Sequence, residues 1–270
     1  MSRAGRGFPV LLLAMAAAFG APGRSAGELA KVDLELVLAV DVSRSMDPEE
    51  QAIQRKGYED AFRSPEVLAA ILGGGLGRIA VTYVEWAGTE IQNVIVPWTA
   101  IVDAETAGGF ADAIARHNPQ RLSRTSIAGA LDHAGTLFGA RYNGIRRVID
   151  ISGDGPNNQG RLVEAARDDA LRDGVVINGL PLLVRPAGFG FGIENLDEYY
   201  EDCVIGGAGA FVLPVTDWSQ FGAAVRRKLV LEISGMPARL HLAQATARDK
   251  VDCQIGEKLW EQRMRNLELQ

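Results

Sequence analysis

The chain has 270 residues, of which 47% are hydrophobic and 23% are charged. This composition is typical of a globular protein with a sizeable core and excludes a mainly disordered chain. The 28 Lys and Arg residues against 34 Asp and Glu residues give a net charge of −6. That balance disfavours nucleic acid as a partner, because nucleic-acid binding requires a basic surface. Two cysteines exclude both a disulfide-rich scaffold and a four-cysteine zinc site.

The first residues have the pattern of an export signal. Arg3 and Arg6 precede the apolar run 8–19, and small residues follow that run. An apolar run of about a dozen residues is too short to span a bilayer. We therefore expect residues 1–26 to be a signal peptide, and the mature protein to be exported to the periplasm or secreted, without a membrane span. An uncleaved N-terminal anchor is the alternative.

Strand-like and helix-like segments alternate along the rest of the chain. A buried strand is predicted at 33–40, and the helix-start sequence Asp47-Pro48-Glu49-Glu50 begins a helix that runs to about Phe62. The runs 79–86 and 91–98 predict a hairpin. Further helices are predicted at 104–117, 126–138, 160–173, 196–200 and 217–228. Further strands are predicted at 147–152, 175–183 and 210–215.

This alternation predicts an α/β fold. We expect a doubly wound, mainly parallel sheet flanked by helices, with one antiparallel edge strand. The domain is expected to cover 33–235, and a charged, helix-prone C-terminal tail to cover 236–270. Ligand sites in such sheets lie at the carboxyl ends of the strands. The loops that follow Val40 and Ser152 are therefore the places to look for function.

The segment DVSRS, residues 41–45, lies between the first predicted strand and a capped helix. Alternate residues of an extended segment point the same way, so Asp41, Ser43 and Ser45 can converge on one point. Carboxylate and hydroxyl oxygens suit Mg²⁺, Mn²⁺ or Ca²⁺ better than zinc. Asp and Ser are also common turn residues, which is the structural alternative.

Two later segments add to this pattern. Thr125 lies at the start of a predicted helix, and Asp154 follows another strand, so both can reach the same sheet edge. With these residues the chain resembles a von Willebrand factor A-type domain over about 33–235. The metal-ion-dependent adhesion site of that family uses a DxSxS loop, a later Thr and a later Asp. Carried over by position, its ligands are Asp41, Ser43, Ser45, Thr125 and Asp154.

One position departs from the family pattern, because this chain has Gly153-Asp154-Gly155 where the family usually has Thr-Asp-Gly. A closer likeness is to an uncharacterised group of exported bacterial proteins with this domain. The segments that carry this closer likeness are LELVLAVDVSRSMD, VINGLPLLV and DEYYEDCVIGGAGAFVLPV.

The resemblance implies a non-catalytic protein that binds a protein ligand through the metal. Two carboxylates and three hydroxyls leave a six-coordinate Mg²⁺ with an exchangeable position, which a carboxylate of the partner can fill. In the family, such binding sometimes accompanies a shift of the last helix. One alternative is a metal-assisted phosphoryl or ester hydrolase, for which Asp47 and Asp150 are the available acids. Another alternative is a structural envelope protein whose metal only stabilises the fold.

Other motifs are absent or open to two interpretations. The three histidines, His117, His133 and His241, lack metal-ligand spacing, and the chain contains no HExxH, GxSxG or Walker-type motif. In an oxidising compartment Cys203 and Cys253 can form a disulfide; free thiols are the alternative. Trp260 and the 267–269 region can pack the tail on the domain or on a partner, or the tail can be frayed.

Overall fold

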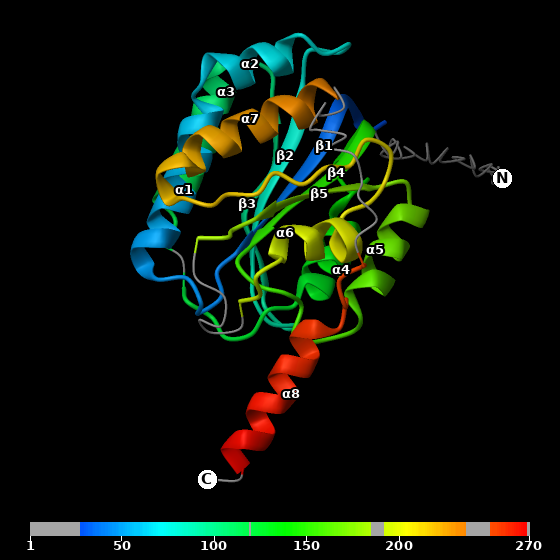
Figure 1. The fold of residues 1–270 in the computed structure, drawn as a ribbon. Helices are drawn as coiled ribbons and strands as arrows, with labels where there is room; N and C mark the ends of the chain where they lie inside the picture. The colour runs from blue at the N-terminus through cyan, green and yellow to red at the C-terminus, as the bar shows by residue number, and fades with distance from the viewer. Residues whose placement is uncertain (1–27, 119, 185–191, 236–248, 269–270) are drawn as a thin grey trace, which may run out of the picture.

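A five-stranded sheet forms the centre of the molecule (Figure 1), in a computed structural model that describes residues 28–118, 120–184, 192–235 and 249–268. The strand order is β3-β2-β1-β4-β5. Their bounds are β1 (Ala30–Asp41), β2 (Ile79–Trp86), β3 (Gln92–Ile101), β4 (Tyr142–Gly153) and β5 (Val176–Pro181). All neighbours are parallel except β3, which pairs antiparallel with β2 at the edge. This confirms the predicted fold class. The predicted signal peptide, residues 1–26, lies outside the described residues.

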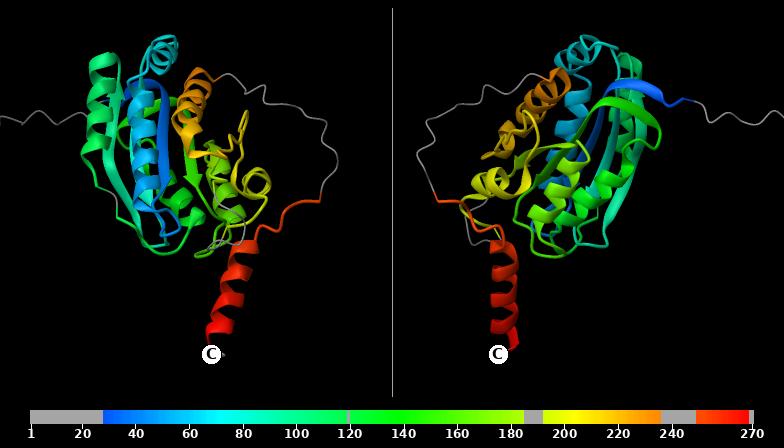
Figure 2. Two further views of the ribbon diagram at one scale, coloured as in Figure 1. Left: turned by 60° about the vertical axis from the view of Figure 1, so that its left-hand side comes forward. Right: turned by 90° about the vertical axis from the view of Figure 1, so that its right-hand side faces the viewer.

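Helices cover both faces of the sheet (Figures 1 and 2). One face is covered by α1 (Pro48–Phe62), α2 (Pro65–Leu72), α3 (Ala104–Arg116) and α7 (Phe221–Ser234), which the 3₁₀ turn η2 (Trp218–Gln220) precedes. The other face is covered by α4 (Ile127–Leu137), α5 (Val163–Arg172) and α6 (Leu196–Tyr199), which continues into the π-helical turn η1 (Tyr200–Val204). The last helix, α8 (Ile255–Glu268), projects from the domain. In the described part of the chain, no helix combines the length and apolarity needed to cross a membrane.

The central strand β1 is apolar along most of its length because both of its faces are buried. Leu36, Leu38 and Val40 pack toward the face covered by α1 and α7, and Val37 and Ala39 pack toward the face covered by α4 and α5. A strand that is buried on both sides reads as a continuous apolar run rather than as an alternating one. The polar residues that follow β1 therefore begin where the strand leaves the core.

Two sequence predictions differ from the structure. The predicted strand at 210–215 is wrong as a continuous strand, because this segment forms only isolated bridges, of Val212 with Gly179 and of Val215 with Leu182. Pro214 and Pro181 both lack an N–H, which interrupts a regular ladder. Helix α2 was not predicted, although Ser64 accepts a hydrogen bond from the backbone N–H of Val67 and caps it.

The C-terminal segment is fixed to the domain. Cys203 of η1 and Cys253 form a disulfide, which decides between the two interpretations of the cysteines. Close by, Asn157 Nδ2 donates a 2.7 Å hydrogen bond to Glu257 Oε1 of α8. A Cβ atom at Gly256 would lie 2.0 Å from the carbonyl oxygen of Asn157, so only glycine allows α8 to approach this closely.

Candidate metal centre

The register of the sheet brings the ends of three parallel strands to one edge. Asp41, the last residue of β1, is paired with Trp86 at the end of β2, and Val40 is paired with Ser152 near the end of β4. Helix α1 anchors the backbone at this edge, because Gln54 Nε2 donates a 3.0 Å hydrogen bond to the carbonyl of Asp41. The edge is therefore a rigid base for the residues that follow each strand.

Hydrogen bonds join the loop after β1 to the loop after β4. The Asp41 Oδ1 atom accepts from the backbone N–H of Ser43 at 2.7 Å, and the hydroxyl oxygens of Ser43 and Ser45 are 2.8 Å apart. The Ser45 hydroxyl then donates to Asp154 Oδ1 at 2.7 Å, although these residues are 109 positions apart in the sequence. Four of the five predicted ligands are thus connected through direct hydrogen bonds.

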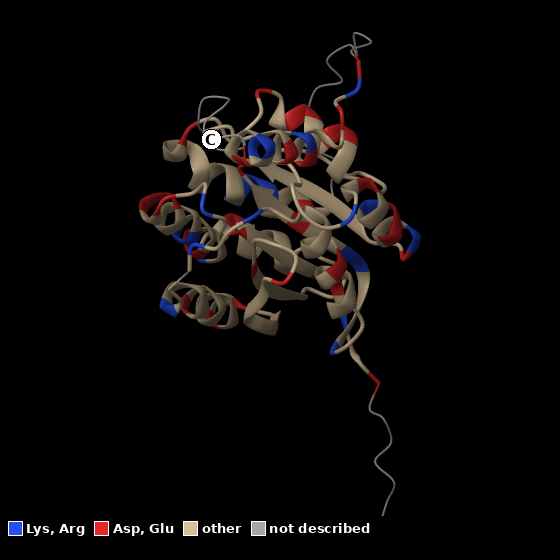
Figure 3. Ribbon diagram, turned by 90° about the horizontal axis from the view of Figure 1, so that it is seen from below, with Lys and Arg blue, Asp and Glu red and all other residues tan. Residues whose placement is uncertain are grey.

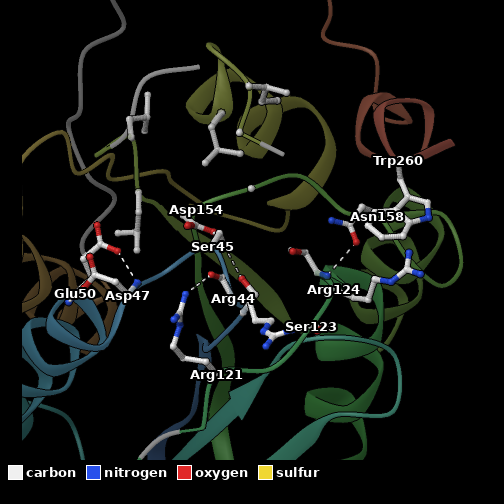
Figure 4. Close-up of a pocket in the computed structure, with 18 of the residues that line it drawn as sticks. Arg44, Ser45, Asp47, Glu50, Arg121, Ser123, Arg124, Asp154, Asn158 and Trp260 are labelled. Atoms are coloured by element: carbon white, nitrogen blue, oxygen red, sulfur yellow. Dashed lines mark hydrogen bonds between the residues drawn. The ribbon is translucent and has the colours of Figure 1, made fainter. Parts of the chain in front are cut away.

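Thr125, the fifth predicted ligand, is held to the loop after Asp154 by a reciprocal pair of hydrogen bonds. Its N–H donates to Asn158 Oδ1 at 3.0 Å, and the N–H of Asn158 donates to its carbonyl at 2.9 Å. Thr125, Ser43, Ser45 and Asp154 line one cavity of about 1210 Å³, part of which is shown in Figure 4. The structure therefore brings all five residues into one neighbourhood.

Asn157 and Asn158 position this neighbourhood, and neither is among the residues predicted from the sequence. Asn157 is fully buried; its side-chain oxygen accepts from the N–H of Ala128 in α4 at 3.1 Å, and its own N–H donates to Tyr199 Oη at 3.2 Å. The signal in the sequence is the Asn-Asn pair directly after the Asp154-Gly155-Pro156 turn. Such side chains can satisfy the backbone groups of two neighbouring loops at once.

The electrostatics of this edge favour a cation. Asp41 is completely buried, and both that burial and the negative charge of Asp154 raise the pKa of its carboxyl group. Among the described residues, Asp41 Oδ2 has no hydrogen-bond partner. A buried carboxylate oxygen beside a second carboxylate is costly unless a positive charge compensates it. Two carboxylates with three hydroxyls are the oxygen donors that a hard divalent cation prefers, so the residues present fit such an ion.

The departure at Gly153 has a structural explanation. A Cβ atom at this position would lie 2.9 Å from Tyr200 Oη and 3.1 Å from Asp41 Oδ2. Tyr200 is fully buried, and it occupies the space that a threonine side chain at position 153 would need. Glycine at this position therefore accompanies a tyrosine packed against the Asp41 carboxylate.

The two acids considered for hydrolysis have other partners. Asp47 caps α1, accepting hydrogen bonds from the N–H groups of Glu49 and Glu50 at 2.9 Å. Asp150 is buried, and its Oδ1 lies 2.6 Å from Lys228 Nζ of α7.

Within the described ranges, no group of three or more His, Cys, Asp or Glu residues is placed to hold a metal. The candidate centre thus depends on its two carboxylates and its hydroxyls.

The fold of this chain is that of solved von Willebrand factor A-type structures. Its sheet and helices are similar to those of the solved von Willebrand factor type A structure from Catenulispora acidiphila, with 14% identity, a TM-score of 0.52, and coverage of 75% of this chain and 43% of that chain. At this level of identity the likeness shows the fold alone.

The chain belongs to the family described as "Protein of unknown function (DUF1194)", which matches residues 31–237. No curated protein matches it. Proximal thread matrix protein 1 from the mussel byssus is 14% identical with a TM-score of 0.56, over 76% of this chain and 49% of that one. The pilus adhesin SpaC from Lactobacillus rhamnosus GG is 12% identical with a TM-score of 0.56, over 75% and 30%. The chain thus spans less than half the length of each of these proteins.

Proposed function

We propose that this protein is an exported, non-catalytic domain that binds a partner protein through a divalent cation. Asp41, Ser43, Ser45, Thr125 and Asp154 hold the ion, with Mg²⁺ as the first candidate and Mn²⁺ or Ca²⁺ as the others. The ion supplies an exchangeable coordination position, and a carboxylate of the partner fills it.

The observation that carries this proposal is the buried Asp41 carboxylate beside Asp154, with one oxygen that has no partner in the described part of the chain. Similar folds support it further. One solved form of the mussel matrix protein is described as having a zinc-occupied MIDAS motif, at 15% identity and a TM-score of 0.56. The Cys203–Cys253 disulfide supports export, since disulfides persist in oxidising compartments.

Calorimetry with Mg²⁺ and Mn²⁺ tests the metal. Wild-type protein should bind in the millimolar range or more tightly, and Asp41→Ala should abolish binding because the buried carboxylate is lost. A matched control is Asp217→Ala, which removes an exposed carboxylate from the start of η2. Absence of binding to the wild type contradicts the metal proposal.

Pull-down from an envelope fraction, with and without a chelator, tests the partner. The proposal expects proteins that are captured only when the cation is present. A set of captured proteins that the chelator leaves unchanged contradicts it. A phosphatase and esterase screen tests the hydrolase alternative: metal-dependent turnover that is lost in Asp154→Ala would replace the binding proposal by that activity.

A further inference from the structure

The cavity beside the candidate metal centre is lined by three arginines as well as by the predicted ligands. Arg44 lies in the loop after β1, between Ser43 and Ser45, and Arg121 and Arg124 lie in the segment before α4. In the ranges that the structure describes, none of the three guanidinium groups forms an ion pair with a carboxylate. The cavity is also lined by Asp47, Glu50, Asp154 and Glu194, but in these ranges the three guanidinium groups are not paired with them and can therefore pair with a carboxylate of a partner.

The positive charge has a defined place in the cavity. Arg121 Nη2 donates a 2.7 Å hydrogen bond to the carbonyl of Arg44, which joins the two segments. In Figure 4 Arg44 and Arg121 lie near Ser45, with Asp47 and Glu50 toward one side of the view, and Arg124 lies toward the other side, beside Trp260. Seen from below, acidic and basic residues are interspersed over the rest of the molecule (Figure 3). The arginines are thus a local feature of the cavity and do not belong to a broad basic face.

The backbone conformation of Arg124 indicates that the surrounding structure holds this arginine in place. It is the one residue other than glycine with a positive φ, 77°, within the described ranges. A bulky side chain in this conformation is strained, and such strain persists where the surrounding structure imposes it, often at ligand sites. The guanidinium of Arg124 lies 3.3 Å from the centroid of the Trp260 ring. Helix α8 therefore supplies one wall of the cavity and fixes the direction of this arginine.

We infer that the cavity binds a segment of a partner protein that carries two acidic side chains, one at the metal and the second against Arg44 and Arg124, next to Trp260. The inference rests on the proposed function, because that function assigns the first carboxylate to the metal. A guanidinium group suits the second carboxylate, since it can donate two parallel hydrogen bonds to it. Stacking on Trp260 restricts the Arg124 side chain, so little side-chain freedom is lost when the segment binds.

A peptide-display selection tests this inference. Random peptides of about a dozen residues, long enough for an extended segment, are selected on the full, disulfide-bonded chain in Mg²⁺ and in chelator. The same selection is run on Arg44→Gln/Arg124→Gln, whose altered side chains form no hydrogen bond to the described backbone. Arg227→Gln is the matched control, because Arg227 is exposed on α7 and does not line the cavity. Calorimetry with Mg²⁺ checks that each variant retains its metal site.

The expected result is that wild type and Arg227→Gln enrich peptides with two nearby acidic residues. One enriched peptide should lose about tenfold in affinity when its second acid is changed to the amide, and the double arginine variant should remove that difference. Enrichment of singly acidic peptides, equal affinity for the acid and the amide, or no enrichment on the wild type overturns the inference. Equal enrichment in chelator, or no Mg²⁺ binding, instead overturns the proposed function. The affinity difference between the acid and the amide peptide, on wild type and on the double arginine variant, then decides whether the arginines bind the second carboxylate without the metal.

Discussion

The buried Glu232 of α7 leads to a prediction about how the free energy of unfolding depends on pH. Its side chain is fully buried with Lys228, whose ammonium group contacts both Glu232 and Asp150. Asn178 Nδ2 also donates to Glu232 Oε1 at 3.0 Å. Burial and the negative charge of Asp150 raise the pKa of the Glu232 carboxyl group from 4.5 to about 8. Much of the Glu232 population is therefore protonated at neutral pH.

The sign of the pH effect on stability follows from the raised pKa of Glu232. The folded protein binds a proton more tightly at Glu232 than the unfolded chain does, so this group's contribution to stability is complete below pH 4.5 and is lost as the pH rises toward about 8. Each pKa unit corresponds to about 1.4 kcal/mol, so the whole shift corresponds to about 5 kcal/mol. Glu232→Gln keeps the side chain neutral, and the variant should gain this amount relative to wild type across that range.

Urea denaturation at a series of pH values measures the effect. The difference in unfolding free energy between Glu232→Gln and wild type should widen steadily between the two pKa values and then level off. Glu105→Gln is the control, because Glu105 is exposed on α3. Parallel stability curves for wild type and Glu232→Gln would refute the reasoning, since they would mean that this carboxyl group is no easier to protonate in the folded state.

Two further predictions concern the cavity. The apparent affinity for Mg²⁺ should fall about tenfold for each pH unit below the raised pKa of Asp41, because protons compete with the cation for its carboxylate. Calorimetry at a series of acidic pH values measures this affinity. A constant affinity would speak against Asp41 as a ligand. In Cys203→Ser/Cys253→Ser, the backbone amides of α8 from Lys258 onward should lose their protection from hydrogen exchange. Those of β1 and β4 should keep theirs, because α8 is held mainly by the disulfide and a few contacts. Unchanged protection in α8 would show that these contacts suffice without the disulfide.

The sequence was informative where local chemistry and chain order agree. The apolar run of β1 and the Asp47 cap of α1 predicted a strand-to-helix turn, and the structure has one there. The order of strands and helices then placed Thr125 and Asp154 near Asp41, because parallel strands end at a common edge. The role of these residues as metal ligands stays a prediction.

Tertiary contacts explain what the sequence could not give. Lys228 was predicted as the end of a helix, where a cation is favourable, but α7 continues to Ser234 and buries Lys228 between Asp150 and Glu232. Nothing local distinguishes such a lysine from an exposed one. In the same way, Trp260 was compatible with a frayed tail, and only its stacking on Arg124 resolves that alternative.

The contact between the start of α8 and the loop after β4 links the position of the whole helix to that loop. Gly256 rests on Asn157, three residues beyond Asp154 on the same loop, so any displacement of that loop acts at the base of the helix. The stretch from Gly256 to Glu268 extends about 18 Å at 1.5 Å per residue. A tilt of about 10° at the base would displace the tip by about 3 Å, so α8 converts a small movement of that loop into a larger movement at its C-terminal end.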